Sequence, residues 1–192
     1  MNDVLERIIA DGQERQWPQL IDRDTEIREH AGKISVVLGM RRVGKTSLCI
    51  QKIQSLKKQG VPSERILYIN FEDERLLPFE TRHFQQLLDV YFRMFPQVTQ
   101  GAFYLFMDEP QRIEGWELFA RRLLDEGRAR IYITGSSAKL LSREIATSLR
   151  GRALPTELFP LRFSEYLRFQ TIEYAEHMER STAGQAILGS AL

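Results

Sequence analysis

A glycine-rich loop between two apolar segments carries the clearest chemistry in this sequence. Residues 39–46, GMRRVGKT, follow the apolar run ISVVL and precede the segment SLCIQKIQSL. Two glycines with four residues between them, then a lysine and a hydroxyl residue, form the pattern of a loop that wraps the phosphates of a nucleoside triphosphate. In such a loop the backbone N–H groups point at the phosphates, with the positive end of the next helix behind them.

The side chains of this loop have separate expected roles. We predict that Lys45 binds the β- and γ-phosphates and that the hydroxyl of Thr46 is a ligand of Mg²⁺. For the two arginines of the loop a surface position is the alternative, and we expect one of them to contact phosphate. The predicted nucleotide-binding residues are Gly39, Arg41, Arg42, Val43, Gly44, Lys45, Thr46 and Ser47.

An acidic pair follows another apolar run, AFYLFM. A carboxylate at the end of such a strand is typical of the residue that holds Mg²⁺ in phosphate-loop enzymes, so we assign Asp108 to the metal together with Thr46. Glu109 can polarise an attacking water as a general base. Alone, the pair would read as a solvated turn. Combined with the upstream loop it favours hydrolysis, because many nucleotide kinases have no second acid there.

Hydroxyl and arginine residues complete the candidate catalytic set. The segment IYITGSS places Thr134 or Ser136 where either could bond the γ-phosphate or the attacking water, and helix capping by Ser136 or Ser137 is the alternative. Arg150 and Arg152 could approach a γ-phosphate in the same subunit or a neighbouring one, as an arginine finger does. Two exposed arginines are an equally good interpretation.

The chain alternates between strand and helix patterns around these motifs. Near-continuous apolar runs, as in buried parallel strands, occur at residues 34–38, 65–71, 102–107, 130–134 and within 152–161. Helical spacing occurs at residues 4–9, 20–32, 45–60, 81–95 and 115–127. This pattern predicts an α/β three-layer sandwich whose ligand lies beyond the carboxyl ends of the strands, where the loop, the acidic pair and the hydroxyl cluster all fall.

Five segments together resemble the AAA-type P-loop ATP-binding proteins of bacteria and archaea, in which an ATPase core precedes a helical C-terminal domain of unknown function. They are GMRRVGKTSL, YINFED, FMDEPQRIEGWE, YITGSSAKLLSREIATSLRGR and LFPLRFSEYL. The resemblance implies a mainly parallel five-stranded sheet in the order 5-1-4-3-2, and ATP rather than GTP. It also implies that Thr134 to Ser136 act as a sensor and that Arg152 responds to the nucleotide. Pro110 stands where the family often has isoleucine.

The predicted organisation has three parts: an N-terminal helical segment at residues 1–32, the ATPase core at 33–162, and the start of a helical C-terminal region at 163–192, which we expect to be truncated. The net charge of +1 gives no indication of nucleic-acid binding, and a single cysteine excludes an internal disulfide. The apolar runs are too short to span a membrane. We therefore expect a cytoplasmic protein. We also expect that a protein partner or the missing C-terminal domain responds to its nucleotide state, and an oligomer is possible.

These observations together predict Mg²⁺-dependent ATP binding and slow hydrolysis to ADP and phosphate, driving a conformational switch. One alternative is a signalling or scaffold module that binds ATP without hydrolysing it. A small-molecule or nucleotide kinase is a second alternative, although no arginine-rich lid is evident. A DNA-stimulated motor finds little support in the near-neutral charge.

Overall fold

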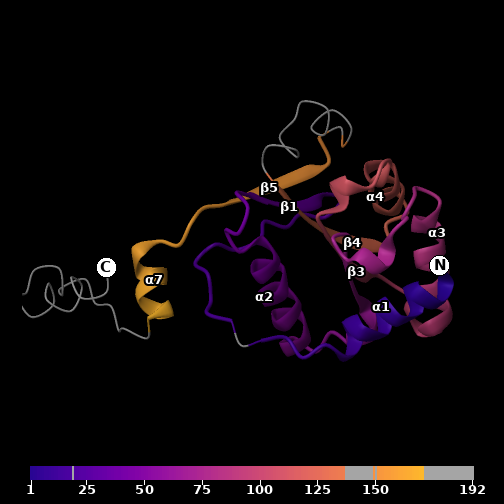
Figure 1. Cartoon of the computed structure of the whole chain (residues 1–192), viewed down its shortest axis with the longest axis horizontal. Helices are drawn as coiled ribbons and strands as arrows, with labels where there is room; N and C mark the ends of the chain where they lie inside the picture. The colour runs from indigo at the N-terminus through magenta and orange to yellow at the C-terminus, as the bar shows by residue number, and fades with distance from the viewer. Residues whose placement is uncertain (19, 137–148, 150, 171–192) are drawn as a thin grey trace, which may run out of the picture.

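The sheet has the predicted strands in the predicted order. The computed structural model describes residues 1–18, 20–136, 149 and 151–170. Five strands lie parallel in the order β2-β3-β4-β1-β5, which confirms the order 5-1-4-3-2 and the α/β fold class (Figure 1). Their bounds are Ile34–Gly39 (β1), Ile66–Asn70 (β2), Phe103–Asp108 (β3), Ala129–Ser136 (β4) and Ala153–Leu158 (β5).

Helices cover both faces of this sheet and make the three layers. Helix α2 (Lys45–Lys58) lies on one face, and α1 (Asn2–Glu14), α3 (His83–Met94) and α4 (Trp116–Asp125) lie on the other (Figure 1). Side chains alternate along each strand. Within β1, Val37 therefore joins the smaller core beside α2, while Val36 and Leu38 join the larger core beside α1, α3 and α4. Within the described residues no helix is both long and apolar enough to cross a membrane.

Helix α1 lies where its apolar spacing predicts it. Its buried residues Leu5, Ile8 and Ile9 belong to the larger core, and the helix contacts α3 and β2. The first part of the predicted N-terminal segment is therefore packed onto the sheet layers. Division of the chain at residues 32 and 162 stays a prediction.

The predicted helix at residues 20–32 is wrong. This stretch, which we call the connecting segment, contains neither helix nor strand and ends in a turn at residues 31–32. The N–H of Arg28 donates to Oγ1 of Thr156 in β5 at 2.9 Å, and its carbonyl accepts from Oγ of Ser35 in β1 at 2.8 Å. These contacts with distant residues satisfy the backbone in place of helical bonds, so tertiary structure overrides local helical spacing.

Candidate nucleotide-binding site

The glycine-rich loop joins β1 to α2 with a backbone that requires its glycines. A Cβ on Gly39 would lie 2.7 Å from the carbonyl oxygen of Leu158 and from Cγ1 of Val43, closer than any side chain can approach. Gly44 and Arg42 both adopt left-handed backbone, with φ of 97° and 63°. Left-handed residues in such a loop turn successive N–H groups toward one concavity, which is how phosphate sites are built. The loop thus has the backbone of an anion site.

Lys45 is the first residue of α2 and is buried under this loop. Its Nζ lies 3.1 Å from the carbonyl oxygen of Met40 and 3.4 Å from that of Gly39. The same ammonium lies 3.4 Å from Oε1 of Glu109. The lysine therefore sits between the loop and the acidic pair, where a phosphate would meet both.

Asp108 ends β3 and lies almost fully buried, with three hydroxyls donating to its carboxylate. Oγ1 of Thr46 and the hydroxyl of Tyr68 each lie 2.8 Å from Oδ2, and the hydroxyl of Thr134 donates to Oδ1. A buried charge is tolerated when hydrogen bonds of this kind compensate for lost hydration. The network fixes the orientation of Asp108 next to the phosphate loop.

This pair of oxygen donors fits Mg²⁺. Magnesium prefers hard oxygen ligands and commonly binds one or two protein groups together with phosphates and water. The Thr46 hydroxyl and the Asp108 carboxylate are already in contact, at the start of α2 and the end of β3. One carboxylate and one hydroxyl beside a loop suited to phosphate is the donor set that a magnesium nucleotide requires.

Glu109 has an unusual backbone and two side-chain partners. Its φ of 55° is left-handed at the point where β3 ends, and its Oε1 lies 3.4 Å from Nζ of Lys45. The Nε2 of Gln111 donates to Oε2, and the Glu109 N–H donates to Oγ1 of Thr134 at 3.1 Å. The carboxylate of the candidate base thus contacts both Lys45 and Gln111.

Thr134 is brought to the acidic pair, as the sensor prediction requires, but its hydroxyl is already used. It lies 1% exposed in β4, donates to Asp108 and accepts from the backbone of Glu109. Ser136 is paired in register with Gly39 through its backbone, and its side chain lies outside the described part of the chain. Ser137 and Arg150 also lie outside it.

Arg152 is not brought together with the other predicted residues. It immediately precedes β5, and its carbonyl accepts from the N–H of Ile34, at the amino end of β1. The loop begins at the other end of that six-residue strand, roughly 16 Å away at about 3.3 Å per residue. The guanidinium of Arg152 instead pairs with Asp125 at the end of α4, at 2.8 Å. Arg152 therefore faces away from the loop of its own chain.

The remaining loop residues divide into exposed and partly buried positions. Arg41 and Arg42 are exposed, and among the described residues neither guanidinium has a hydrogen bond or ion pair. Val43 and Ser47 are half-buried.

Two residues that contact the site, Tyr68 and Arg23, belong to neither sequence motif. Tyr68 pairs in register with Phe106, two residues before Asp108, so it lies diagonally across from the carboxylate on the same face. Burial, with the nearby Asp108 carboxylate adding to it, raises the pKa of the Tyr68 hydroxyl far above its ordinary value, so this hydroxyl remains a donor. Arg23, in the connecting segment, donates from Nη1 to the carbonyl of Val43 at 3.0 Å. The sequence feature that could have indicated Tyr68 was a hydroxyl residue on the strand that pairs with β3.

Known proteins resemble this chain in sequence over most of its length. An uncharacterized protein of Methanocaldococcus jannaschii is 42% identical over 183 residues, which cover 90% of this chain and 39% of the relative. An uncharacterized protein of Haemophilus influenzae is 39% identical over 141 residues, covering 73% of this chain and 34% of the relative. This chain therefore spans less than half the length of these relatives. Among solved structures, that of C. elegans PCH-2 matches with a TM-score of 0.45 and 14% identity, over 87% of this chain and 44% of that one.

A family model extends over both the loop and the acidic pair. The model describes an AAA domain and matches residues 31–167, from just before β1 into α7 (Phe163–Phe169). That range contains all five strands and every described residue of the candidate site except Arg23. The chain belongs to this AAA domain family of nucleotide-binding, ATPase-type proteins.

Proposed function

We propose that this chain binds ATP with Mg²⁺ and hydrolyses it slowly to ADP and phosphate, and that the two nucleotide states act as a conformational switch. The observation that carries the proposal is the convergence of Lys45, Thr46, Asp108 and Glu109. These residues come from two segments about sixty positions apart and meet within hydrogen-bond or ion-pair distance. A phosphate-binding cation, a magnesium donor pair and a candidate base are the parts that hydrolysis requires.

The site contains contacts that a nucleotide would replace. Lys45 neutralises Glu109 and bonds two loop carbonyls. A triphosphate in the loop offers this ammonium stronger anionic partners, which would draw it away from the carboxylate. Thr46 and Asp108 would hold Mg²⁺, which when bound neutralises charge on the phosphate oxygens.

Glu109, once released, can act on water. Its carboxylate takes a proton from the water whose oxygen bonds the γ-phosphorus, while the bond from that phosphorus to the β–γ bridging oxygen breaks and ADP leaves. Thr134 and Tyr68 keep Asp108 in place, and Thr134 also holds the Glu109 backbone. Thr134, Tyr68 and Asp108 therefore position the base relative to the glycine-rich loop.

The test is phosphate release from ATP and Mg²⁺ against protein concentration, with Glu109→Gln as the blank. Release above the blank supports an ATPase. If neither protein releases phosphate while calorimetry shows that both bind ATP, the hydrolytic part of the proposal fails and the nucleotide-binding part stands.

A specific observation favours the alternative of a module that binds ATP without hydrolysing it. Both carboxylate oxygens of Glu109 are engaged, one by Lys45 and the other by Gln111. A base held in this way stays inactive until something withdraws both partners. Retained ATP binding without turnover, in a protein of the length of the relatives, would support this alternative.

The partner and compartment are part of the same proposal. We expect a protein partner, or a helical region following the core as in the family, to read the switch. Cys49 is buried and unpaired, which suits the reducing cytoplasm. Because the side chain of Arg152 is one third exposed and lies at the amino edge of the sheet, we assign it to a neighbouring subunit's nucleotide rather than to its own.

A further inference from the structure

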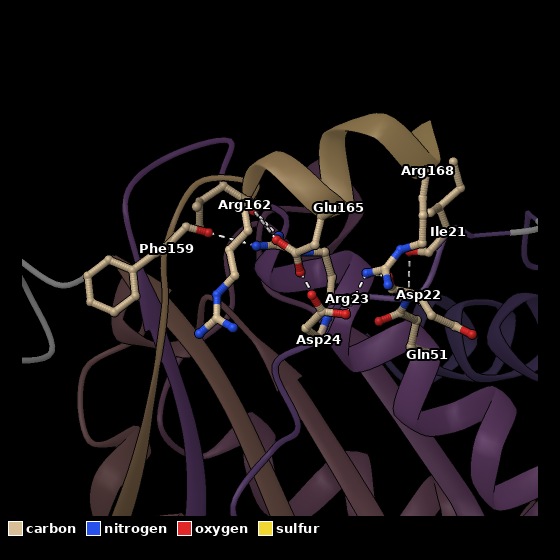
Figure 2. Close-up of polar contacts among 10 residues, drawn as sticks. Ile21, Asp22, Arg23, Asp24, Gln51, Phe159, Arg162, Glu165 and Arg168 are labelled. Carbon is tan, nitrogen blue, oxygen red and sulfur yellow. Dashed lines mark hydrogen bonds and ion pairs between the residues drawn. The ribbon is translucent and has the colours of Figure 1, made fainter. Parts of the chain in front are cut away.

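Arg23 has a nearly buried side chain that donates hydrogen bonds to three separate parts of the chain. Its side chain is 6% exposed. Besides Val43 in the loop, it reaches the carbonyl of Phe159, just after β5, at 2.7 Å through Nη2, and Oε1 of Glu165 in α7 at 2.9 Å through Nε (Figure 2). Each nitrogen of the guanidinium thus has a different acceptor, an arrangement that suits the planar fork of an arginine.

The contact with Val43 bears directly on the phosphate site. The peptide bond between Val43 and Gly44 is planar, and in a trans peptide the carbonyl and the following N–H point in opposite directions. Because Arg23 holds the Val43 carbonyl, the N–H of Gly44 must point away from Arg23. Gly44 caps α2, so this N–H belongs to the free donors at the helix start that bind phosphate.

The contact with Glu165 bears on α7. Glu165 is 1% exposed and also accepts from the N–H of Asp24 at 2.8 Å and from the N–H of Arg162 at 2.7 Å (Figure 2). The carboxylate therefore ties the start of α7 to the connecting segment and to Arg23. The guanidinium of Arg23 therefore holds both the Glu165 carboxylate and the Val43 carbonyl.

We propose that Arg23 is a positioning residue of the nucleotide site, which directs the Gly44 N–H at the bound phosphate and thereby couples nucleotide occupancy to the seating of α7. This inference rests on the proposed function, since it assumes that ATP binds the loop. Coupling between two sites is reciprocal. If a seated α7 prepares the loop for ATP, then bound ATP holds α7 in place by the same factor. The switch would in this way reach the segment that leads out of the core.

The variants that test this separate the charge of Arg23 from its geometry. Arg23→Lys keeps the charge but cannot bond Val43, Phe159 and Glu165 together. Glu165→Gln keeps the shape of the anchor and removes its charge. Arg168→Gln is the matched control, because Arg168 also joins α7 to the connecting segment, through Asp24 at 2.5 Å and the carbonyl of Asp22 at 3.1 Å, without touching the loop (Figure 2).

Two measurements on the full chain give the result. Calorimetry with ATP and Mg²⁺ should show about tenfold weaker binding for Arg23→Lys and for Glu165→Gln, the loss expected for one charge-assisted hydrogen bond, and a change of about twofold or less for Arg168→Gln. Hydrogen exchange of the α7 amides, with and without ATP, should show nucleotide-dependent protection in the wild type and in Arg168→Gln, but not in the other two variants.

The outcomes distinguish this inference from the function on which it rests. If the wild type binds no ATP, the proposed function fails and the inference fails with it. If the wild type binds ATP while Arg23→Lys and Glu165→Gln keep its affinity and its α7 protection, the coupling is overturned and the proposed function stands. A purely structural role would lower the melting temperature and leave affinity unchanged in the folded variants, which also overturns it.

Discussion

The Nζ of Lys45 lies 3.4 Å from Oε1 of Glu109, so the predicted phosphate-binding cation and the candidate base form an ion pair. Both side chains come from the carboxyl edge of the sheet, Lys45 from the start of α2 and Glu109 from the turn after β3. The buried ammonium of Lys45 is thus compensated within the protein, by one carboxylate and two loop carbonyls.

Lys45→Ala should weaken ATP binding strongly. The variant loses the charge-assisted contact with phosphate, worth about 1.5–3 kcal/mol, so the affinity for MgATP should fall at least about tenfold and up to about a hundredfold. Calorimetry measures this directly. Lys58→Ala, at the exposed far end of α2, is the control that should bind as the wild type does. Unchanged affinity in Lys45→Ala would refute the assignment of the loop.

Glu109→Gln should keep ATP binding and lose turnover. A positioned general base contributes about 10²–10⁴-fold to rate, and the amide cannot accept the proton. Single-turnover phosphate release compares the variant with the wild type. Glu114→Gln makes the same chemical change at an exposed position five residues further on and should leave the rate unchanged. Equal hydrolysis by Glu109→Gln and the wild type would remove Glu109 from its role.

The strands could be predicted because their signals are local. Each buried strand is a short apolar run that ends in a motif or a turn, and the observed bounds differ from the expected ones by one or two residues at most ends. The strand order came from the resemblance, not from the runs themselves. The helix prediction for the connecting segment failed because Leu20, Ile21 and Ile27 mimic helical spacing. The hydrogen bonds of this segment run instead to Ser35, Thr156 and Glu165.

The site could be predicted only where its residues share a sequence motif. Lys45, Thr46, Asp108 and Glu109 belong to two compact motifs, so their meeting followed from the position of the strand ends. Tyr68 and Arg23 belong to neither. The bond from Tyr68 to Asp108 joins residues 40 positions apart, and that from Arg23 to Glu165 joins residues 142 apart. Both depend on register and packing that no local pattern encodes. Arg152 shows the converse, a motif residue whose place in the fold lies at the opposite edge.

Tyr68→Phe should destabilise the protein through Asp108. It removes one of three hydroxyls that compensate a buried carboxylate, which should lower the free energy of unfolding by about 1–3 kcal/mol. Urea denaturation without nucleotide measures the change. Tyr104→Phe is the matched control, because Tyr104 lies on β3 beside the same core and among the described residues its hydroxyl makes no hydrogen bond. Equal stability of the two variants would contradict a role for Tyr68 in holding Asp108.

Arg152→Ala should lower the rate of ATP hydrolysis only at protein concentrations at which subunits associate. Because Arg152 faces away from its own loop, the variant should bind ATP normally, and its specific rate should no longer rise with protein concentration. Asp125→Ala removes the ion-pair partner of Arg152 but keeps the guanidinium, and it should retain the concentration dependence. A wild-type rate that is independent of concentration, or an Arg152→Ala rate that still rises, would rule out a finger supplied by a neighbour.

The contribution of Glu165 to stability should depend on pH. Burial alone would raise the pKa of this carboxyl, but the hydrogen bonds from Arg23 and from the N–H groups of Arg162 and Asp24 outweigh it and lower the pKa from 4.5 to about 2. A group whose pKa is lower in the folded state stabilises that state above its unfolded pKa. The stabilisation is lost as the pH falls from 4.5 toward about 2.

Comparison of the wild type with Glu165→Gln isolates this contribution from other titrating groups. At neutral pH the free energy of unfolding should be larger in the wild type by on the order of 3 kcal/mol, at about 1.36 kcal/mol per unit of pKa change. Urea denaturation at a series of pH values should show the difference constant above pH 5 and shrinking steadily below it. If the difference in unfolding free energy instead stays constant down to pH 3, protonation of Glu165 does not weaken its contact with Arg23. That result would mean that Arg23 holds Glu165 through shape rather than charge.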